Sequence, residues 1–315
     1  MTQLTATTSY KQLSGYEIPI IALGVWQAPA DVTRKVVYDA LNIGYRHIDS
    51  AQAYRNEKEV GEGILQWLSE DPSRKRSDIF YTTKVFLHGY EVAKDTVKES
   101  FEKVKDLEYI DLILIHNARS NKKLRLETWK ALQEFVEDGT TRSIGVSNWG
   151  IKHLDELFDS DVYKAKNIPV SVNQVELHPF LVRSQLTDYL AEKGIIAEAY
   201  SPLTHALRLD DETVVAIAKK YNKSPAQILI RWGLQRGFVS LPKTVTHSRL
   251  VENYEVFDFE IGKEDQEKLT SLDENWTFSK RFGDQLYIND ITDEQYEAQL
   301  NENFPELYSL LTKKA

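Results

Sequence analysis

The chain of 315 residues contains no cysteine, which removes several kinds of chemistry at once. Disulfide scaffolds, thiolate metal sites and cysteine nucleophiles are all excluded. The chain also lacks an uncharged apolar stretch of the roughly 18 residues that a membrane-spanning helix needs. Its first residues, MTQLTATTSYKQLSG, lack the apolar core of a signal peptide. We therefore expect a soluble, cytoplasmic protein.

Basic residues are fewer than acidic residues in this chain. The sequence has 39 Lys and Arg against 48 Asp and Glu, for a formal net charge of -9. Nucleic acids and anionic membranes attract clustered positive charge, so we expect neither as a partner.

Three common motifs are absent as well. No GxGxxG sequence occurs, which argues against the doubly wound dinucleotide-binding fold. There is no Walker loop and no HExxH helix, and we expect no metal. A dinucleotide bound here would need another device to hold its phosphates.

Short apolar runs rich in isoleucine, valine and tyrosine alternate with longer segments of helical periodicity. This alternation is typical of repeated βα units, and the number of runs is the number that closes a (β/α)8 barrel. The runs span residues 19–26, 45–51, 79–85, 109–116, 141–148, 169–177, 195–200 and 238–244.

One helix and one helix start are predicted in more detail. Leu126, Trp129, Leu132 and Val136 recur at three- and four-residue steps, which indicates an amphipathic helix that Gly139 ends. Before another helix, residues 56 and 59 (an asparagine and a glutamate) resemble a capping pair.

No internal repeat, low-complexity tract or Pro/Gly/Ser linker divides the chain. We expect residues 1–315 to form one α/β domain, a single (β/α)8 TIM barrel with an N-terminal hairpin. From about residue 274 onward, an aromatic-rich C-terminal tail is expected to lie over the substrate cleft. Its aromatic residues are Trp276, Phe278, Phe282, Tyr287, Tyr296, Phe304 and Tyr308.

Polar residues end successive apolar runs, where a barrel places its functional groups. Asp49, Lys84 and His116 end the second, third and fourth runs, and Tyr54 follows closely after the second. Reduction of a carbonyl needs a proton donor and positioned hydrogen-bond donors. A lysine ammonium at about 4 Å would favour the phenolate of Tyr54 by up to roughly 4 kcal/mol, before desolvation opposes it. Taken singly, each residue also suits packing or a structural ion pair.

The later runs carry groups that suit a dinucleotide. Ser147, Asn148 and Gln174 have the donors and acceptors that a carboxamide requires, and Tyr200 has a flat face for stacking. Capping of strands is the alternative role for these residues. After the eighth run, Lys243 and Arg249 bracket a predicted helix start, which favours an anion such as a phosphate.

The segment from residue 44 to residue 61, GYRHIDSAQAYRNEKEVG, resembles the signature of the aldo-keto reductase family, with Ser50 in place of the usual threonine. The resemblance implies a catalytic tetrad, which is Asp49, Tyr54, Lys84 and His116. It implies nicotinamide contacts from Ser147, Asn148, Gln174 and Tyr200, and further cofactor contacts from Ser201 and Leu203. It also implies NADPH phosphate contacts from Lys243, Thr244 and Arg249, an adenine contact from Asn253 and a cleft wall from Trp26.

The resemblance to fungal members of the family implies NADPH-dependent reduction of aldehyde or ketone carbonyls to alcohols, with Tyr54 as general acid. We expect a small-molecule substrate and a monomer, with a dimer left open. One alternative is an NADPH-binding regulatory subunit of the potassium-channel β type. Another is a barrel enzyme that handles phosphosugars without redox chemistry, using Lys243 and Arg249 for the substrate phosphate.

Overall fold

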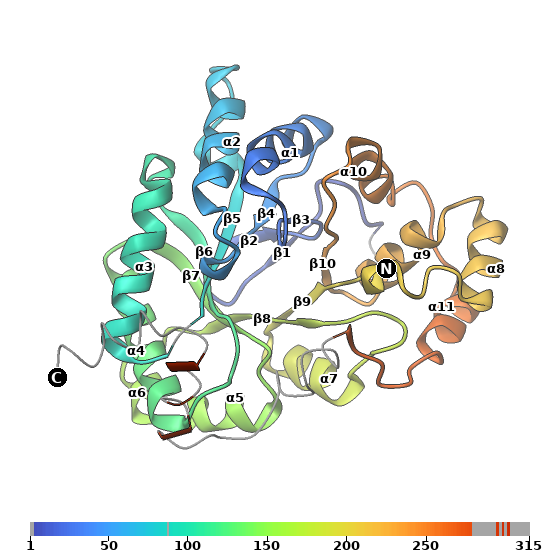
Figure 1. Cartoon of the computed structure of the whole chain (residues 1–315). Coiled ribbons are helices and arrows are strands. Elements are labelled where there is room, and N and C mark those ends of the chain that lie inside the picture. The colour runs from blue at the N-terminus through green and yellow to red at the C-terminus, as the bar shows by residue number, and fades with distance from the viewer. Residues whose placement is uncertain (1–2, 87, 279–293, 296–297, 299–300, 303–315) are drawn as a thin grey trace.

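The computed structural model describes residues 3–86, 88–278, 294–295, 298 and 301–302. A sheet of eight parallel strands runs through its centre in the order β10-β9-β8-β7-β6-β5-β4-β3, so each strand lies beside its neighbour in sequence (Figure 1). The strands are β3 (Leu23–Gly24), β4 (His47–Asp49), β5 (Phe80–Val85), β6 (Ile110–Ile115), β7 (Thr141–Ser147), β8 (Val170–Glu176), β9 (Ile196–Tyr200) and β10 (Val239–Leu241).

The sheet closes on itself at its two ends. Ala22 N donates to Ser240 O at 2.9 Å, and Gly24 N donates to Pro242 O at 3.0 Å. These bonds join the first strand to the last, so the predicted (β/α)8 barrel is confirmed. An antiparallel hairpin of β1 (Ser9–Lys11) and β2 (Glu17–Pro19) precedes the barrel, as expected.

The first strand is shorter than the sequence predicted. Only Leu23–Gly24 pair with β4, whereas Ile21 meets Ser240 as an isolated bridge. Each of the other seven predicted runs contains one of the remaining strands.

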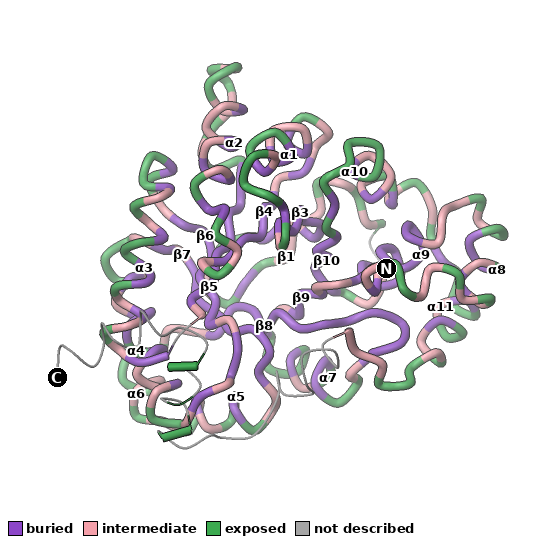
Figure 2. Tube along the Cα trace, viewed as in Figure 1, coloured by how far each residue is buried: buried purple, intermediate pink, exposed green. Residues whose placement is uncertain are grey.

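Helices surround the sheet, and their inner faces are buried while their outer faces are exposed (Figures 1 and 2). The helices are α1 (Ala30–Ile43), α2 (Glu57–Ser69), α3 (Tyr90–Val104), α4 (Lys122–Glu137), α5 (Ile151–Phe158), α6 (Asp161–Lys166), α7 (Ser184–Lys193), α8 (Glu212–Tyr221), α9 (Pro225–Gln235), α10 (His247–Tyr254) and α11 (Lys263–Thr270). Among the described residues, no helix is long and apolar enough to cross a membrane.

The two local helix predictions have different outcomes. The amphipathic helix is α4, and Gly139 follows it with φ 83°, as a helix stop requires. Asn56 does precede α2, but its side chain does not cap the helix. Its amide instead donates to Val25 O at 2.9 Å and accepts from Ser50 Oγ at 3.0 Å. The predicted capping pair is therefore wrong, because Asn56 joins two loops at the top of the barrel.

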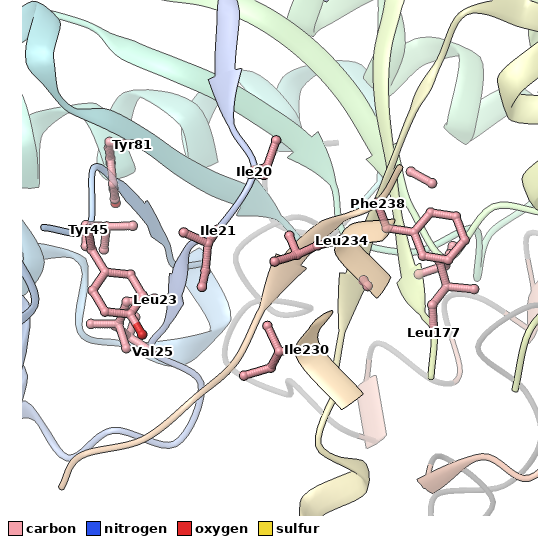
Figure 3. Close-up of a cluster of buried hydrophobic side chains, with 14 of the residues drawn as sticks. Ile20, Ile21, Leu23, Val25, Tyr45, Tyr81, Leu177, Ile230, Leu234 and Phe238 are labelled. Atoms are coloured by element: carbon pink, nitrogen blue, oxygen red, sulfur yellow. The ribbon is translucent and has the colours of Figure 1, made fainter. Parts of the chain in front are cut away.

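The two faces of each strand pack against different surroundings. On β5, Phe80 belongs to a small apolar cluster with Leu112, Leu114 and residues of other strands, whereas Tyr81 packs in the larger cluster that includes helix residues. Figure 3 shows buried side chains of the larger cluster. Since side chains alternate along a strand, Lys84 lies on the same face as Phe80, inside the barrel.

Little of the aromatic tail lies in the described part. Trp276 N donates to Phe180 O at 3.0 Å, which brings the start of the tail against the loop after β8. Phe282, Tyr287, Tyr296, Phe304 and Tyr308 lie outside the described residues.

A tight approach between strands makes Gly145 a sensitive position. A Cβ at residue 145 would lie 2.5 Å from Val172 O, at the place where the register between β7 and β8 shifts. We expect Gly145→Ala to lower the free energy of unfolding by about 1–3 kcal/mol, since strand backbone must move. Urea unfolding followed by circular dichroism measures this change.

The matched control is Gly233→Ala on α9, where the nearest atom to the new Cβ is 3.9 Å away. A helix interior favours alanine over glycine by about 0.5–1 kcal/mol, so this variant should be as stable as the wild type or more stable. Equal destabilisation by both substitutions would contradict the steric argument.

Candidate active site

A cavity of about 390 Å³ lies at the carboxyl ends of the strands, within the usual size range of small-molecule sites. Most residues that the sequence singled out line it. They are Trp26, Asp49, Tyr54, His116, Ser147, Asn148, Gln174, Tyr200, Ser201, Leu203 and Lys243. Lys84 lies fully buried behind this wall, and Thr244, Arg249 and Asn253 lie outside the lining.

A buried ion pair forms the back of the cavity. Lys84 Nζ donates to both carboxylate oxygens of Asp49 at 2.8 Å and to Ser50 O at 2.8 Å. It also lies 3.3 Å from Tyr54 Oη. Tyr54 ends a short 3-10 turn, Gln52–Tyr54, directly after β4. The barrel therefore brings the predicted Asp, Lys and Tyr into one connected group.

Two opposing effects set the pKa of the Tyr54 phenol. Burial raises the pKa of Tyr54, and the Lys84 charge opposes this without cancelling it, so the phenol stays protonated at neutral pH. Burial lowers the pKa of Lys84, but Asp49 and Tyr54 outweigh this effect, and the ammonium stays charged. The attraction of the ammonium considered in the sequence analysis is present, but desolvation exceeds it, so the pKa of Tyr54 is raised.

His116 lies next to Tyr54 on the cavity wall. Their rings meet edge to face with centroids 5.7 Å apart, and Phe86 contacts the His116 ring in the same way at 5.5 Å. Burial, and then the charge of Lys84, lower the pKa of His116 to about 3. The imidazole is therefore neutral at pH 7 and carries one N–H that it can donate to a carbonyl oxygen.

The polar residues at the ends of β7 and β8 form hydrogen bonds within the protein. Asn148 Nδ2 donates to His116 O at 3.0 Å and to Ser147 Oγ at 3.1 Å, and Asn148 Oδ1 accepts from Tyr200 Oη at 2.9 Å. Ser147 Oγ in turn donates to Gln174 O at 2.9 Å. The donors of Asn148 and Ser147 are used within the protein, so these two residues keep only oxygen lone pairs for a ligand. This differs from the predicted mixture of donors and acceptors.

An aromatic rim, made of Trp26, His205 and Phe278, covers one side of the cavity. His205 stacks on Phe278 with ring centroids 3.5 Å apart, and Trp26 meets His205 edge to face at 5.4 Å. Ser201 Oγ lies 3.0 Å from His205 Nε2. Sequence reasoning assigned no role to His205, because a single histidine in a one-turn 3-10 helix, Thr204–Ala206, has no periodicity that places it.

Glu176 ties the start of the tail to this rim. Its carboxylate accepts from Phe278 N at 2.9 Å, from the Thr277 hydroxyl and from His178 Nε2 at 3.2 Å. Burial raises the pKa of Glu176, but these hydrogen bonds outweigh it, so the pKa lies below its ordinary value. A charged carboxylate thus holds Thr277 and Phe278 beside the cavity.

Two cations lie where a phosphate was predicted. Lys243 lines the cavity, and Arg249 is exposed on α10. Neither forms an ion pair with any of the described residues. The side chain of Thr246, which precedes α10, makes no capping bond, so the first two amides of the helix, those of His247 and Ser248, remain available to an anion. Thr244 and Asn253 are buried nearby on the same segment.

Residues 21–274 match the profile of the Aldo/keto reductase family. The chain is a member of this family. An uncharacterized oxidoreductase of Saccharomyces cerevisiae is 45% identical over 267 residues, which cover 84% of this chain and 94% of the relative. A glyoxal reductase of Bacillus subtilis is 40% identical over 265 residues, which cover 83% of this chain and 91% of the relative. These names support an oxidoreductase that acts on carbonyl groups.

Solved structures agree with this assignment. An aldo/keto reductase from Brucella melitensis has a TM-score of 0.78 and 37% identity, and the match covers 85% of this chain and 100% of that chain. An aldo-keto reductase from a deep-sea metagenome library has a TM-score of 0.79 and 38% identity, with 86% and 97% covered. In the described part of this aldo/keto reductase, no group of three or more His, Asp or Glu is arranged to hold a metal ion.

A second carboxyl group beneath the cavity was missed by the sequence analysis. Glu198 on β9 is fully buried, and its Oε2 accepts from Gln174 Nε2 at 2.8 Å. Burial, and then the charge of Asp49, raise the pKa of Glu198 to about 8. The sequence did contain a sign of this residue. Glu198 stands two positions before Tyr200 in an apolar run, and residues two apart on a strand point to the same face.

The pKa of Glu198 predicts how stability depends on pH in this aldo/keto reductase. The ordinary pKa is 4.5 and the folded value is about 8, so the folded state binds a proton that the unfolded state has released. The stability that this proton contributes is fully present below the ordinary pKa of 4.5, and it is lost as the pH rises toward the folded pKa of about 8. In Glu198→Gln the decline from about pH 7 to about pH 8 should be flatter by up to about 1.4 kcal/mol per pH unit.

Urea unfolding at a series of pH values measures this slope. The control is Glu176→Gln: the pKa of Glu176 is lowered, so the carboxylate is ionised in both states above neutral pH and its replacement should leave the slope unchanged. Parallel curves for the wild type and Glu198→Gln would contradict the assignment of the proton to Glu198.

Proposed function

We propose that this aldo/keto reductase uses NADPH to reduce aldehydes or ketones to alcohols, with Tyr54 as the proton donor. The main support is the contact of Tyr54 Oη with Lys84 Nζ at 3.3 Å, on the wall of a cavity large enough for a small carbonyl compound. When bound, the dinucleotide supplies the hydride. Everything else in the proposed reaction is done by side chains of this chain.

Tyr54 holds the proton, since its raised pKa keeps the phenol protonated at neutral pH. As the proton leaves, the Lys84 ammonium faces the growing charge on the phenol oxygen and stabilises it. Asp49 keeps Lys84 charged and in place through two hydrogen bonds. His116, neutral at pH 7, can donate to the carbonyl oxygen and orient it toward Tyr54.

The residues present also fit the proposed cofactor. Lys243, Arg249 and the first amides of α10 are suited to the additional phosphate that distinguishes NADPH from NADH. The oxygen atoms of Ser147, Asn148 and Gln174 are suited to the N–H groups of a carboxamide. The proposal retains Tyr200 as a contact of the nicotinamide, Ser201 and Leu203 as further contacts of the cofactor, Thr244 beside the phosphate and Asn253 near the adenine.

An enzyme is favoured over a regulatory subunit that only binds the cofactor. Binding alone would not require a proton donor, yet the full set of predicted catalytic residue types is present around one cavity. The names of the relatives, oxidoreductase and glyoxal reductase, also favour an enzyme. A single-domain monomer in the cytoplasm remains part of the proposal.

Replacing the proposed proton donor should stop turnover without removing the cofactor. We expect Tyr54→Phe to lower kcat by about 10²- to 10⁴-fold, because the substitution removes the hydroxyl that carries the proton. The affinity for NADPH, followed by quenching of tryptophan fluorescence, should change by less than about twofold. Turnover is measured as consumption of NADPH with an α-dicarbonyl substrate.

Tyr38→Phe is the matched control, because the Tyr38 hydroxyl bonds Glu70 on the helices outside the barrel. It should turn over like the wild type. Tyr54→Phe that keeps more than about a tenth of the wild-type kcat would contradict the role of proton donor.

Choice of cofactor should depend on Arg249. We expect Arg249→Ala to lower the NADPH-to-NADH ratio of kcat/KM by about 10- to 100-fold, since a charge-assisted hydrogen bond to the phosphate is lost. Lys263→Ala, which removes an exposed cation from α11, is the control for net charge and should leave the ratio unchanged. An unchanged ratio in Arg249→Ala would exclude this phosphate site.

A further inference from the structure

We propose that Glu198 is a positioning residue for the cofactor: it fixes the amide of Gln174 from beneath, so that Gln174 offers its carbonyl oxygen alone to the nicotinamide side of the cavity. This inference rests on the proposed function, because it concerns how that site is held before the cofactor enters.

The first support is the count of hydrogens on one amide group. Gln174 Nε2 donates to Asp49 Oδ1 at 2.9 Å and to Glu198 Oε2 at 2.8 Å. A primary amide has two N–H donors, and both are now used. The remaining polar atom is Oε1, an acceptor, and Gln174 lines the cavity. The orientation of the amide is thus set by two carboxyl groups.

The second support is that Glu198 is held in place by the barrel. It pairs in register with Gln174 across β8 and β9, and it is fully buried. The titratable groups that face it are Asp49 and His47 on β4 and Lys84 on β5, with His47 Nε2 3.8 Å from Glu198 Oε1. With no exit to water, Glu198 cannot turn away from Gln174 without leaving a buried polar group unpaired.

Charge explains how two carboxyl groups can share one amide. Two carboxylates this close would repel each other, and the raised pKa of Glu198 leaves it largely protonated at neutral pH while Asp49 faces Lys84. A protonated carboxyl group still has an oxygen that accepts from Gln174. Glu198 therefore orients the amide without adding a second negative charge behind Tyr54.

A purely structural role predicts a different result on mutation. A buried carboxyl group is costly to desolvate, and an apolar side chain of similar volume at such a position is often neutral or stabilising. If Glu198 served the fold alone, an apolar replacement that keeps or raises the melting temperature should leave NADPH binding intact. A positioning role predicts weaker binding in a stable protein.

The test is a double-mutant cycle on NADPH affinity in the full chain, read by quenching of tryptophan fluorescence, with Tm measured for each variant. Glu198→Leu removes the acceptor and should raise Kd by about 5- to 10-fold in a protein that is still folded at the temperature of the assay. Glu198→Gln keeps an oxygen that can accept from Gln174, and its Kd should stay within about twofold of the wild type. Gln174→Met should raise Kd by about 10-fold or more.

The decisive variant combines Glu198→Leu with Gln174→Met. If Glu198 acts through Gln174, the double variant should bind like Gln174→Met alone. Additive losses would show that Glu198 acts independently of Gln174 and would overturn the inference. So would a Glu198→Leu protein that binds NADPH like the wild type, or a Glu198→Gln protein that binds as weakly as Glu198→Leu.

The experiment also distinguishes a failure to fold from a failure of the inference, and a failure of the inference from a failure of the proposed function. Should Glu198→Leu fail to fold, Glu198→Met, a more flexible apolar replacement, takes its place in the same cycle with the same expectations. A wild-type protein that does not bind NADPH would overturn the proposed function and this inference together. Normal wild-type binding combined with an additive cycle would overturn the positioning role alone.

Discussion

The buried ion pair between Lys84 and Asp49 is the constraint on which the site depends. An ammonium with no exposed surface is stable inside a protein only when its donors are satisfied and its charge is matched. Lys84 meets both conditions through Asp49, the Ser50 carbonyl and the Tyr54 hydroxyl. These partners come from β4 and the segment after it, so the pairing of β4 with β5 also assembles the site.

A second layer of polar groups keeps that pair in one arrangement. Asp49 accepts from Gln174 as well as from Lys84, and Gln174 reaches Glu198 on the next strand. Breaking any of these contacts would leave a donor or acceptor buried without a partner, which costs more than a hydrogen bond contributes. A polar network therefore crosses the barrel interior above the apolar cluster. This network holds the side chains of the cavity wall in one arrangement.

The sequence predicted the strands well, and most side chains that it singled out line the cavity, because the inward face of a strand follows from a period of two. It could not predict which hydrogen bonds those residues would make. Asn56 joins loops instead of capping α2, and the amide hydrogens of Asn148 and Gln174 turn inward. Such choices depend on neighbours far apart in the chain. Glu198 could have been found from its spacing to Tyr200, whereas His205 could not, since a one-turn 3-10 helix has no periodic pattern.

The pKa of Tyr54 shows what the ion pair contributes to the proposed reaction. Burial outweighs the attraction of Lys84, so the resting phenol is a weaker acid than tyrosine in water. The raised pKa keeps the proton on Tyr54 until negative charge develops on the substrate oxygen. The ammonium acts mainly on the phenolate that forms later, because a full negative charge interacts with it far more strongly than a neutral hydroxyl does. Lys84 thus stabilises the end of the proton transfer more than its beginning, which is where a catalyst gains rate.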